Sequence, residues 1–218
     1  MKNLRRFAAI AVVTLGAAAA AAAGPPPSLN APDLAQGPYG QMHMRLQKTM
    51  LKINVADVDV RVDRATQAKI AQAAGGQTYS FDLDHRVAPL VIAAPRAVVQ
   101  MEFVRDVPLN RWMGVVRDNL EQAREAGLIT REVEHRVSDA LPTWFAALKD
   151  RGYLKGDRVI YSVTPNDLRT VVVSAGGQVL MDMSQPGTEA RQVVLASYFA
   201  PKSDTREPLL RSLLSSKQ

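Results

Sequence analysis

The last third of the chain most constrains the fold, because three short runs rich in apolar residues follow one another across very short turns. The strands expected there are residues 157–164, 168–174 and 178–183. The connections, residues 165–167 and 175–177, are rich in Pro, Asn, Asp and Gly, which favour tight reversals. Connections this short join antiparallel neighbours. The pattern therefore predicts an antiparallel meander, and apolar spacing predicts helices at 188–200 and 207–214 after it.

In residues 42–63, apolar and polar residues alternate, which predicts two more strands. The apolar positions change phase between Val55 and Val58. A slip of one residue would turn the wrong face inward unless an extra residue is absorbed. We therefore expect a bulge at Ala56 and a turn near Lys48 and Thr49.

The remaining elements have recognisable ends. They are a strand at residues 96–107 and helices at residues 64–74, 109–126 and 130–148. Asp63 and Thr130 are suitable N-cap residues, Gly75 can end the first helix, and Pro142 predicts a kink in the last. Because strands and helices cluster instead of alternating, we expect an α+β fold with a largely antiparallel sheet backed by helices.

The N-terminus has the three parts of a bacterial export signal. Lys2, Arg5 and Arg6 form a basic region, an uncharged apolar run follows, and small residues end at Ala23. We expect residues 1–23 to be a cleaved signal peptide and the mature chain to begin at Gly24 in the periplasm. An uncleaved anchor is the alternative, but the run is short and mostly alanine. The Arg5-Arg6 pair is compatible with export by either the Sec or the twin-arginine pathway.

The mature chain reads as one domain. Residues 24–39 are proline-rich with little apolar content, which predicts an extended leader before a domain at residues 40–218. The sequence has no cysteine, which excludes disulfides and thiolate metal sites. Half of the net charge of +6 belongs to the signal peptide. The other basic residues form no patch, so we expect no nucleic-acid partner.

Asn119 is the most unusual residue on an apolar helix stripe. It lies two turns after Trp112, so both side chains point the same way. A buried amide needs a hydrogen-bond partner or a cavity. Asn119 therefore faces a pocket or bonds a neighbouring backbone group, and the residues alone do not separate these interpretations.

The order of elements, with residues 98–107, Trp112, Asn119 and the meander at 156–183, resembles the bacterial chalcone-isomerase-like family. The resemblance implies an open-faced sandwich, in which helices cover one face of the sheet and an apolar pocket lies between. In the plant enzymes of this fold, a Tyr and an Asn seven residues apart face the substrate. Trp112 and Asn119 match that pair here, so both are candidate ligand-binding residues.

The same resemblance implies that the catalytic groups are altered. Asn54 stands where the enzymes carry a catalytic Thr. Met42 replaces the Arg that binds the developing oxyanion, and Arg45 is out of register with it. Trp112 can only donate one N–H, and no hydroxyl occurs at residues 192–195. Because the reaction needs such donors, we expect no chalcone isomerisation and predict no catalytic residues.

Fatty-acid-binding members of this fold use a pocket Arg and an aromatic residue for the acid group. The corresponding candidates here are Arg105 and Tyr161. For Arg105 the alternative is an ion pair with Asp106 or Glu102 that fixes the end of the strand.

Other motifs give little support to enzyme classes. The three histidines have no ligand spacing, and we expect the acidic segment 82–85 to be solvated, so no metal or cofactor is predicted. Three hypotheses remain: a protein that binds a small apolar ligand such as a fatty acid, an intramolecular lyase or isomerase using Asn54, Asn119 and Tyr161, and a partner-binding protein with a filled core.

Overall fold

A computed structural model describes residues 24–48 and 53–215. Within these residues, six strands form one sheet in sequence order, and each pairs antiparallel with the next. The strands are β1 (Gln41–Lys48), β2 (Ile53–Val62), β3 (Ala97–Phe103), β4 (Arg158–Val163), β5 (Asp167–Val173) and β6 (Val179–Pro186). This confirms the antiparallel meander of β4 to β6.

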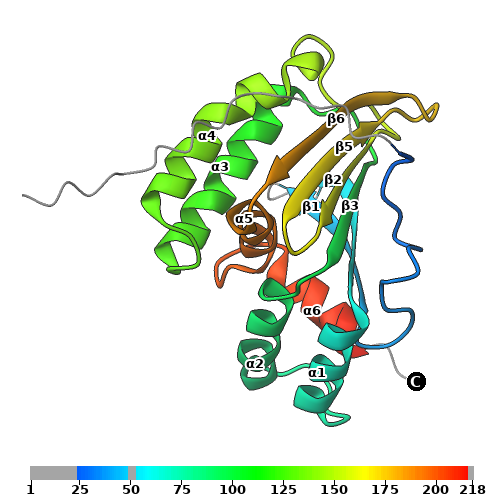
Figure 1. The fold of residues 1–218 in the computed structure, drawn as a ribbon, viewed down its shortest axis with the longest axis vertical. Coiled ribbons are helices and arrows are strands. Elements are labelled where there is room, and N and C mark those ends of the chain that lie inside the picture. Colours follow the sequence, from blue (N-terminus) through cyan, green and yellow to red (C-terminus); the bar gives the residue numbers. More distant parts are fainter. Residues whose placement is uncertain (1–23, 49–52, 216–218) are drawn as a thin grey trace, which may run out of the picture.

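Helices lie on one side of this sheet (Figure 1). The described α-helices are α1 (Arg64–Ala74), α2 (Phe81–Ile92), α3 (Leu109–Glu125), α4 (Arg131–Trp144), α5 (Thr188–Phe199) and α6 (Arg206–Ser215), with a short 3₁₀ helix at Ala146–Leu148. Helices α3, α4 and α5 cover the β3 to β6 half, while α6 packs against β1 and α2 lies against α5 and α6. The expected α+β open-faced sandwich is confirmed.

The predicted helix ends follow from local chemistry. Asp63 accepts a hydrogen bond from the backbone N–H of Thr66, and Gly75 ends α1 in the left-handed conformation. Thr130 caps α4 in the same way as Asp63 caps α1. Helix α2 was not predicted, and the expectation of a solvated segment at 82–85 is wrong for Asp84, which is buried.

The predicted bulge is present but lies one residue earlier. Leu46 pairs with Ala56 and Gln47 pairs with Asn54, so Val55 is the extra residue of β2. The bulge allows Ile53 and Val55 to reach the inner face that Ala56 also faces. The turn expected near Lys48 and Thr49 would fall on residues 49–52, which lie outside the described residues.

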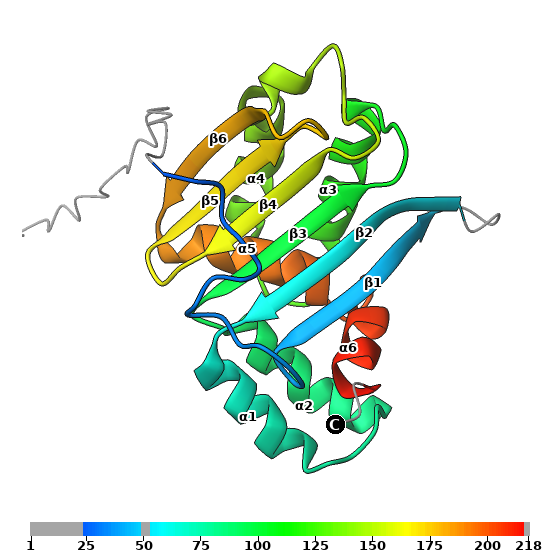
Figure 2. The same ribbon diagram turned by 90° about the vertical axis from the view of Figure 1, so that its right-hand side faces the viewer.

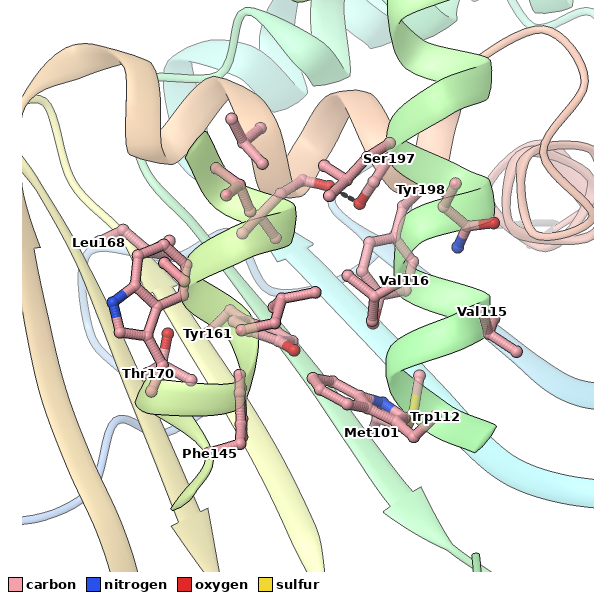
Figure 3. A pocket seen from close by; sticks show the side chains of 18 of the residues that line it. Met101, Trp112, Val115, Val116, Phe145, Tyr161, Leu168, Thr170, Ser197 and Tyr198 are labelled. Atoms are coloured by element: carbon pink, nitrogen blue, oxygen red, sulfur yellow. Dashed lines mark hydrogen bonds between the residues drawn. The ribbon is translucent and has the colours of Figure 1, made fainter. Parts of the chain in front are cut away.

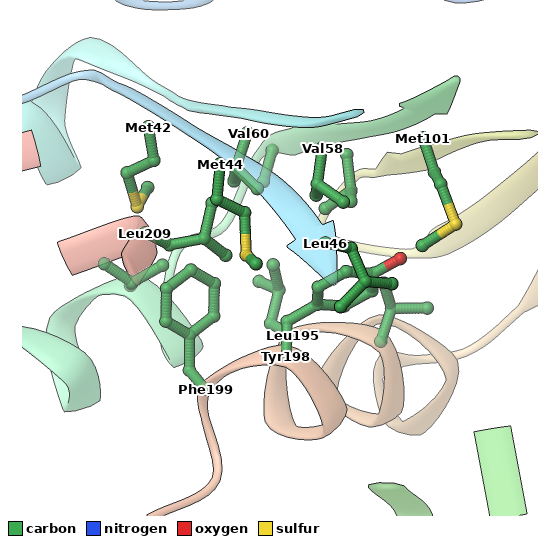
Figure 4. Packing of buried hydrophobic residues seen from close by; sticks show 14 of the residues in the cluster. Met42, Met44, Leu46, Val58, Val60, Met101, Leu195, Tyr198, Phe199 and Leu209 are labelled. Carbon is green, nitrogen blue, oxygen red and sulfur yellow. The ribbon is translucent and has the colours of Figure 1, made fainter. Parts of the chain in front are cut away.

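Half of the inner sheet face is tightly filled. Met42 and Met44 of β1 point toward Leu209 of α6 and Phe199 at the end of α5 (Figure 4). An ion pair between Asp84 of α2 and Arg206 of α6 links these two helices, and both side chains are buried. Tyr79 donates a further hydrogen bond to Asp84 over 3.2 Å. The two charges therefore have the partners that burial requires.

The N-terminal segment 24–40 lies across the opposite face of the sheet (Figure 2). Leu34 is 2% exposed and packs with apolar side chains of β3, β4 and β5. Arg61 donates to the carbonyl of Leu29, and Arg169 donates to those of Gly24 and Pro25. The segment expected to be an extended leader therefore also buries apolar surface. Its apolar contacts come from the sheet, not from within the segment.

Candidate functional site

A cavity of about 1270 Å³ lies between the sheet and helices α3, α4 and α5; most of its strand residues come from β3 to β6, and Leu46, Ile53 and Val55 add the adjoining ends of β1 and β2. Its wall is mostly apolar (Figure 3). Ligand pockets in proteins commonly measure about 300–1,000 Å³, so this one is large. The hypothesis of a filled core without a cavity is therefore wrong. Its central apolar lining residues are Met101, Val115, Val116, Val137, Phe145, Leu168, Met181 and Val194.

Trp112 and Asn119 both line this cavity. Their seven-residue spacing brings them to the same side of α3. The Trp112 ring meets Phe145 edge-on at a centroid distance of 4.6 Å, which fixes its orientation. Asn119 is half-buried, and within residues 24–48 and 53–215 its amide has no hydrogen-bond partner. The neighbouring-backbone interpretation is therefore not supported, and the amide is free to contact a ligand.

Arg105 lies just after β3 and also lines the cavity, with an exposed side chain. In the described part of the chain it forms no ion pair with Glu102 or Asp106. Asp106 instead accepts a hydrogen bond from the backbone N–H of Lys155 over 2.8 Å. The alternative of an ion pair at the end of the strand is therefore wrong.

Arg111 is a second cation on the cavity wall, in the first turn of α3, and sequence reasoning missed it. Its side chain is exposed and has no acidic partner among the described residues. In the sequence, only its position directly before Trp112 could have indicated that Arg111 lies near the cavity. Arg105 and Arg111 thus place two unpaired positive charges at an exposed part of a mostly apolar cavity.

Asn54 does not lie with the other candidates. Its side chain is exposed and accepts a hydrogen bond from Gln47 over 2.9 Å. Ile53 and Val55, its neighbours on either side, line the cavity instead. Side chains of a strand alternate between faces, so Asn54 points away. The polar set of Asn54, Asn119 and Tyr161 expected for an isomerase is therefore not assembled in this structure.

Tyr161 comes from the middle of β4 and lines the cavity opposite α3 (Figure 3). Burial raises its pKa well above the ordinary value, and the nearby Tyr198 of α5 adds to this increase. Burial also raises the pKa of Tyr198. Both phenols are therefore uncharged hydrogen-bonding groups at neutral pH.

Ion pairs occupy other positions on the wall. Arg136 of α4 pairs with Glu189 at the start of α5, and both are largely exposed. Asp182 of β6 is paired with Arg169 over 2.7 Å. These charges already have partners, which leaves Arg105 and Arg111 as the better candidates for binding an anionic group.

Two other kinds of site are not found in the described part of the chain. Within these residues no three His, Asp or Glu side chains are grouped as they would need to be to hold a metal ion. None of the described helices combines the length and the apolar character needed to cross a membrane.

Comparison with solved structures shows the fold. The chain resembles the crystal structure of a fatty-acid binding protein from Arabidopsis thaliana with a TM-score of 0.53, over 84% of this chain and 90% of that one. The chain has the chalcone-isomerase fold. Sequence identity is 12%. No protein-family model matches the sequence, and no curated protein matches it. Membership in the bacterial family therefore stays a prediction.

Proposed function

We propose that this is an exported protein that binds, without catalysing a reaction, a small amphipathic acid such as a fatty acid. The observation that carries the proposal is the large apolar cavity with Arg105 and Arg111 on its wall. Apolar lining with a few placed polar groups is the usual composition of a ligand site. An arginine fork binds a carboxylate in bidentate fashion.

The comparison supports the same ligand class. The Arabidopsis thaliana protein of this fold is a fatty-acid binding protein, and the cavity here offers what an acyl chain and its acid group require. Binding alone is the simpler proposal because Asn54 lies outside the cavity. The isomerase alternative keeps Asn119 and Tyr161, which both line it. That alternative requires Asn119→Ala to abolish turnover of an identified substrate.

Fluorescence provides a direct binding test, because both tryptophans of the chain, Trp112 and Trp144, line the cavity. Adding hexadecanoic acid should change their emission in a saturable way. Arg105→Gln and Arg111→Gln should each weaken binding by roughly ten- to a hundredfold, the effect of losing a charge-assisted hydrogen bond. The matched control is Arg131→Gln, at an exposed position of α4 that does not line the cavity.

The uncharged analogue hexadecan-1-ol separates head-group recognition from apolar burial. Its affinity should not depend on either arginine. If Arg105→Gln and Arg111→Gln weaken binding of the alcohol as much as binding of the acid, the arginines do not recognise the carboxylate. If neither compound binds, the proposed function fails. Native mass spectrometry of protein prepared from cells would also reveal a retained ligand.

Export forms a separate part of the proposal. It predicts that the protein recovered from the periplasmic fraction begins at Gly24, which N-terminal sequencing would determine. Recovery of the chain with residues 1–23 intact in the cytoplasm would contradict it.

A further inference from the structure

A group of three hydroxyls interrupts the apolar wall near the middle of the sheet. Tyr161 and Thr170 are direct cross-strand partners in β4 and β5, so their side chains stand next to each other on the inner face. Tyr198 approaches the cavity from α5 (Figure 3). We call Tyr161, Thr170 and Tyr198 the hydroxyl cluster.

None of the three hydroxyls has a hydrogen-bond partner within residues 24–48 and 53–215. Thr170 is 1% exposed and Tyr198 is 8% exposed, yet none of the three hydroxyl oxygens is among the fully enclosed unpaired atoms of the described residues, so each keeps some accessible surface. An unsubstituted hydrocarbon chain lying against these hydroxyls would cover them without offering a partner, which is unfavourable. All three residues line the cavity, and a polar group of a ligand could therefore pair with their hydroxyls.

The hydroxyl cluster is separate from the arginines. Tyr161 lies opposite Val99 in β3, whereas Arg105 follows the end of β3 at Phe103. The four residues from Val99 to Phe103 span on the order of 13 Å along the strand. A carboxylate bound by Arg105 therefore leaves the cluster beside a later part of the same acyl chain.

We propose that the hydroxyl cluster binds an uncharged oxygen group, a hydroxyl or a carbonyl, in the middle of the ligand's hydrocarbon chain. The preferred ligand is then a mid-chain oxygenated long-chain acid, and not an unsubstituted one. This inference rests on the proposed function, because it assumes that the acid group lies at Arg105 and Arg111. The raised pKa values of Tyr161 and Tyr198 keep both phenols protonated and able to donate.

Three acids of equal length test the inference: octadecanoic acid, 12-hydroxyoctadecanoic acid and 2-hydroxyoctadecanoic acid. Kd is measured by tryptophan fluorescence. The 12-hydroxy acid should bind roughly three- to tenfold more tightly than octadecanoic acid, the range of about one net hydrogen bond. The 2-hydroxy acid carries its hydroxyl near the carboxylate and should show no such gain.

The decisive quantity is the ratio of the Kd values for octadecanoic and 12-hydroxyoctadecanoic acid. Tyr161→Phe, Tyr198→Phe and Thr170→Val keep the shape of the wall and should each move this ratio toward one. Tyr79→Phe is the matched control, because Tyr79 hydrogen-bonds Asp84 and does not line the cavity. It should leave the ratio unchanged.

The possible failures are distinct. If all three acids bind equally well, the inference is overturned and the proposed function stands. The same holds if the preference for the 12-hydroxy acid survives in the double variant Tyr161→Phe, Tyr198→Phe. If none of the acids binds, both are overturned.

Discussion

The two halves of the inner sheet face have opposite packing. Under α2 and α6, the inner side chains of β1 and β2 pack in one core with leucine and phenylalanine side chains of the helices. Val58 and Val60 are 0% exposed there. Under α3 and α4, the same sheet borders a cavity of about 1270 Å³, and Met181 and Met183 of β6 are only half-buried. Because the filled half buries its apolar side chains more completely, we expect it to contribute more to stability than the half that borders the cavity.

The largest expected effect comes from breaking the buried ion pair of the filled half. Arg206→Met leaves Asp84 without its cationic partner and should lower the free energy of unfolding by about 3–5 kcal/mol. Urea denaturation measures this change. The double variant Asp84→Leu, Arg206→Met should regain much of the loss. A wild-type stability for the single variant would show that this pair does not hold the filled half together.

Matched valines compare the two halves directly. Val60→Ala removes methyl groups from a closed core and should cost about 2–3 kcal/mol. Val116→Ala, at a half-buried position on the cavity wall, should cost under about 1 kcal/mol, since its methyl groups already border open space. Equal costs from denaturation curves would mean that the cavity wall is packed as tightly as the core.

Enlarging an alanine should have opposite consequences in the two halves. Ala88→Phe in buried α2 overfills the core and should destabilise the protein by about 1–3 kcal/mol or more. In Ala140→Phe, the new ring on α4 extends into the cavity and should leave the unfolding free energy nearly unchanged. It should weaken the binding of hexadecanoic acid roughly tenfold or more. Undiminished acid binding by Ala140→Phe would place the ligand elsewhere.

The tyrosines of the open half predict an alkaline transition. Burial raises the pKa of Tyr161 and Tyr198 above the ordinary value of 10.0. Their contribution to stability is present below the unfolded-state pKa near 10 and is lost as pH rises toward the folded-state values. Unfolding free energy should therefore fall above about pH 10, and less steeply in Tyr161→Phe, Tyr198→Phe. An identical pH dependence in that variant would contradict this assignment.

The smallest effect is expected at Tyr153, whose ring stacks on Phe103 at 4.2 Å. Its hydroxyl is buried and has no hydrogen-bond partner among the described residues. Tyr153→Phe removes this unsatisfied group, so stability should stay equal or rise by up to about 1 kcal/mol. A clear loss of stability would reveal a partner for the hydroxyl.

Local patterns predicted most of this fold. Asp63 and Gly75 bound α1 because their cap chemistry depends only on nearby residues, and the seven-residue spacing on α3 predicted that Trp112 and Asn119 share a face. Long-range contacts could not be predicted in this way. Asp84 looked solvated because its partner, Arg206, lies 122 residues away.

The candidate site was predictable to a similar extent. Arg105 and Tyr161 line the cavity, although the resemblance grouped them at one acid-binding point and the strand register separates them along β3. Asn54 was misplaced because it came from the resemblance alone, whereas the alternation of Ile53 and Val55, which line the cavity, turns Asn54 to the other face. In a strand, an error of one residue changes the face on which a side chain lies.

The segment 24–40 has a consequence for solubility. It covers the apolar outer face made by Val98, Ile160, Val171 and Val173, with Leu34 at the centre of the contact. An uncovered sheet face of this kind could stack against the same face of a second molecule. The prolines of the segment lack the N–H groups that would recruit another strand. By covering this face, the segment removes the apolar surface through which two copies could otherwise stack.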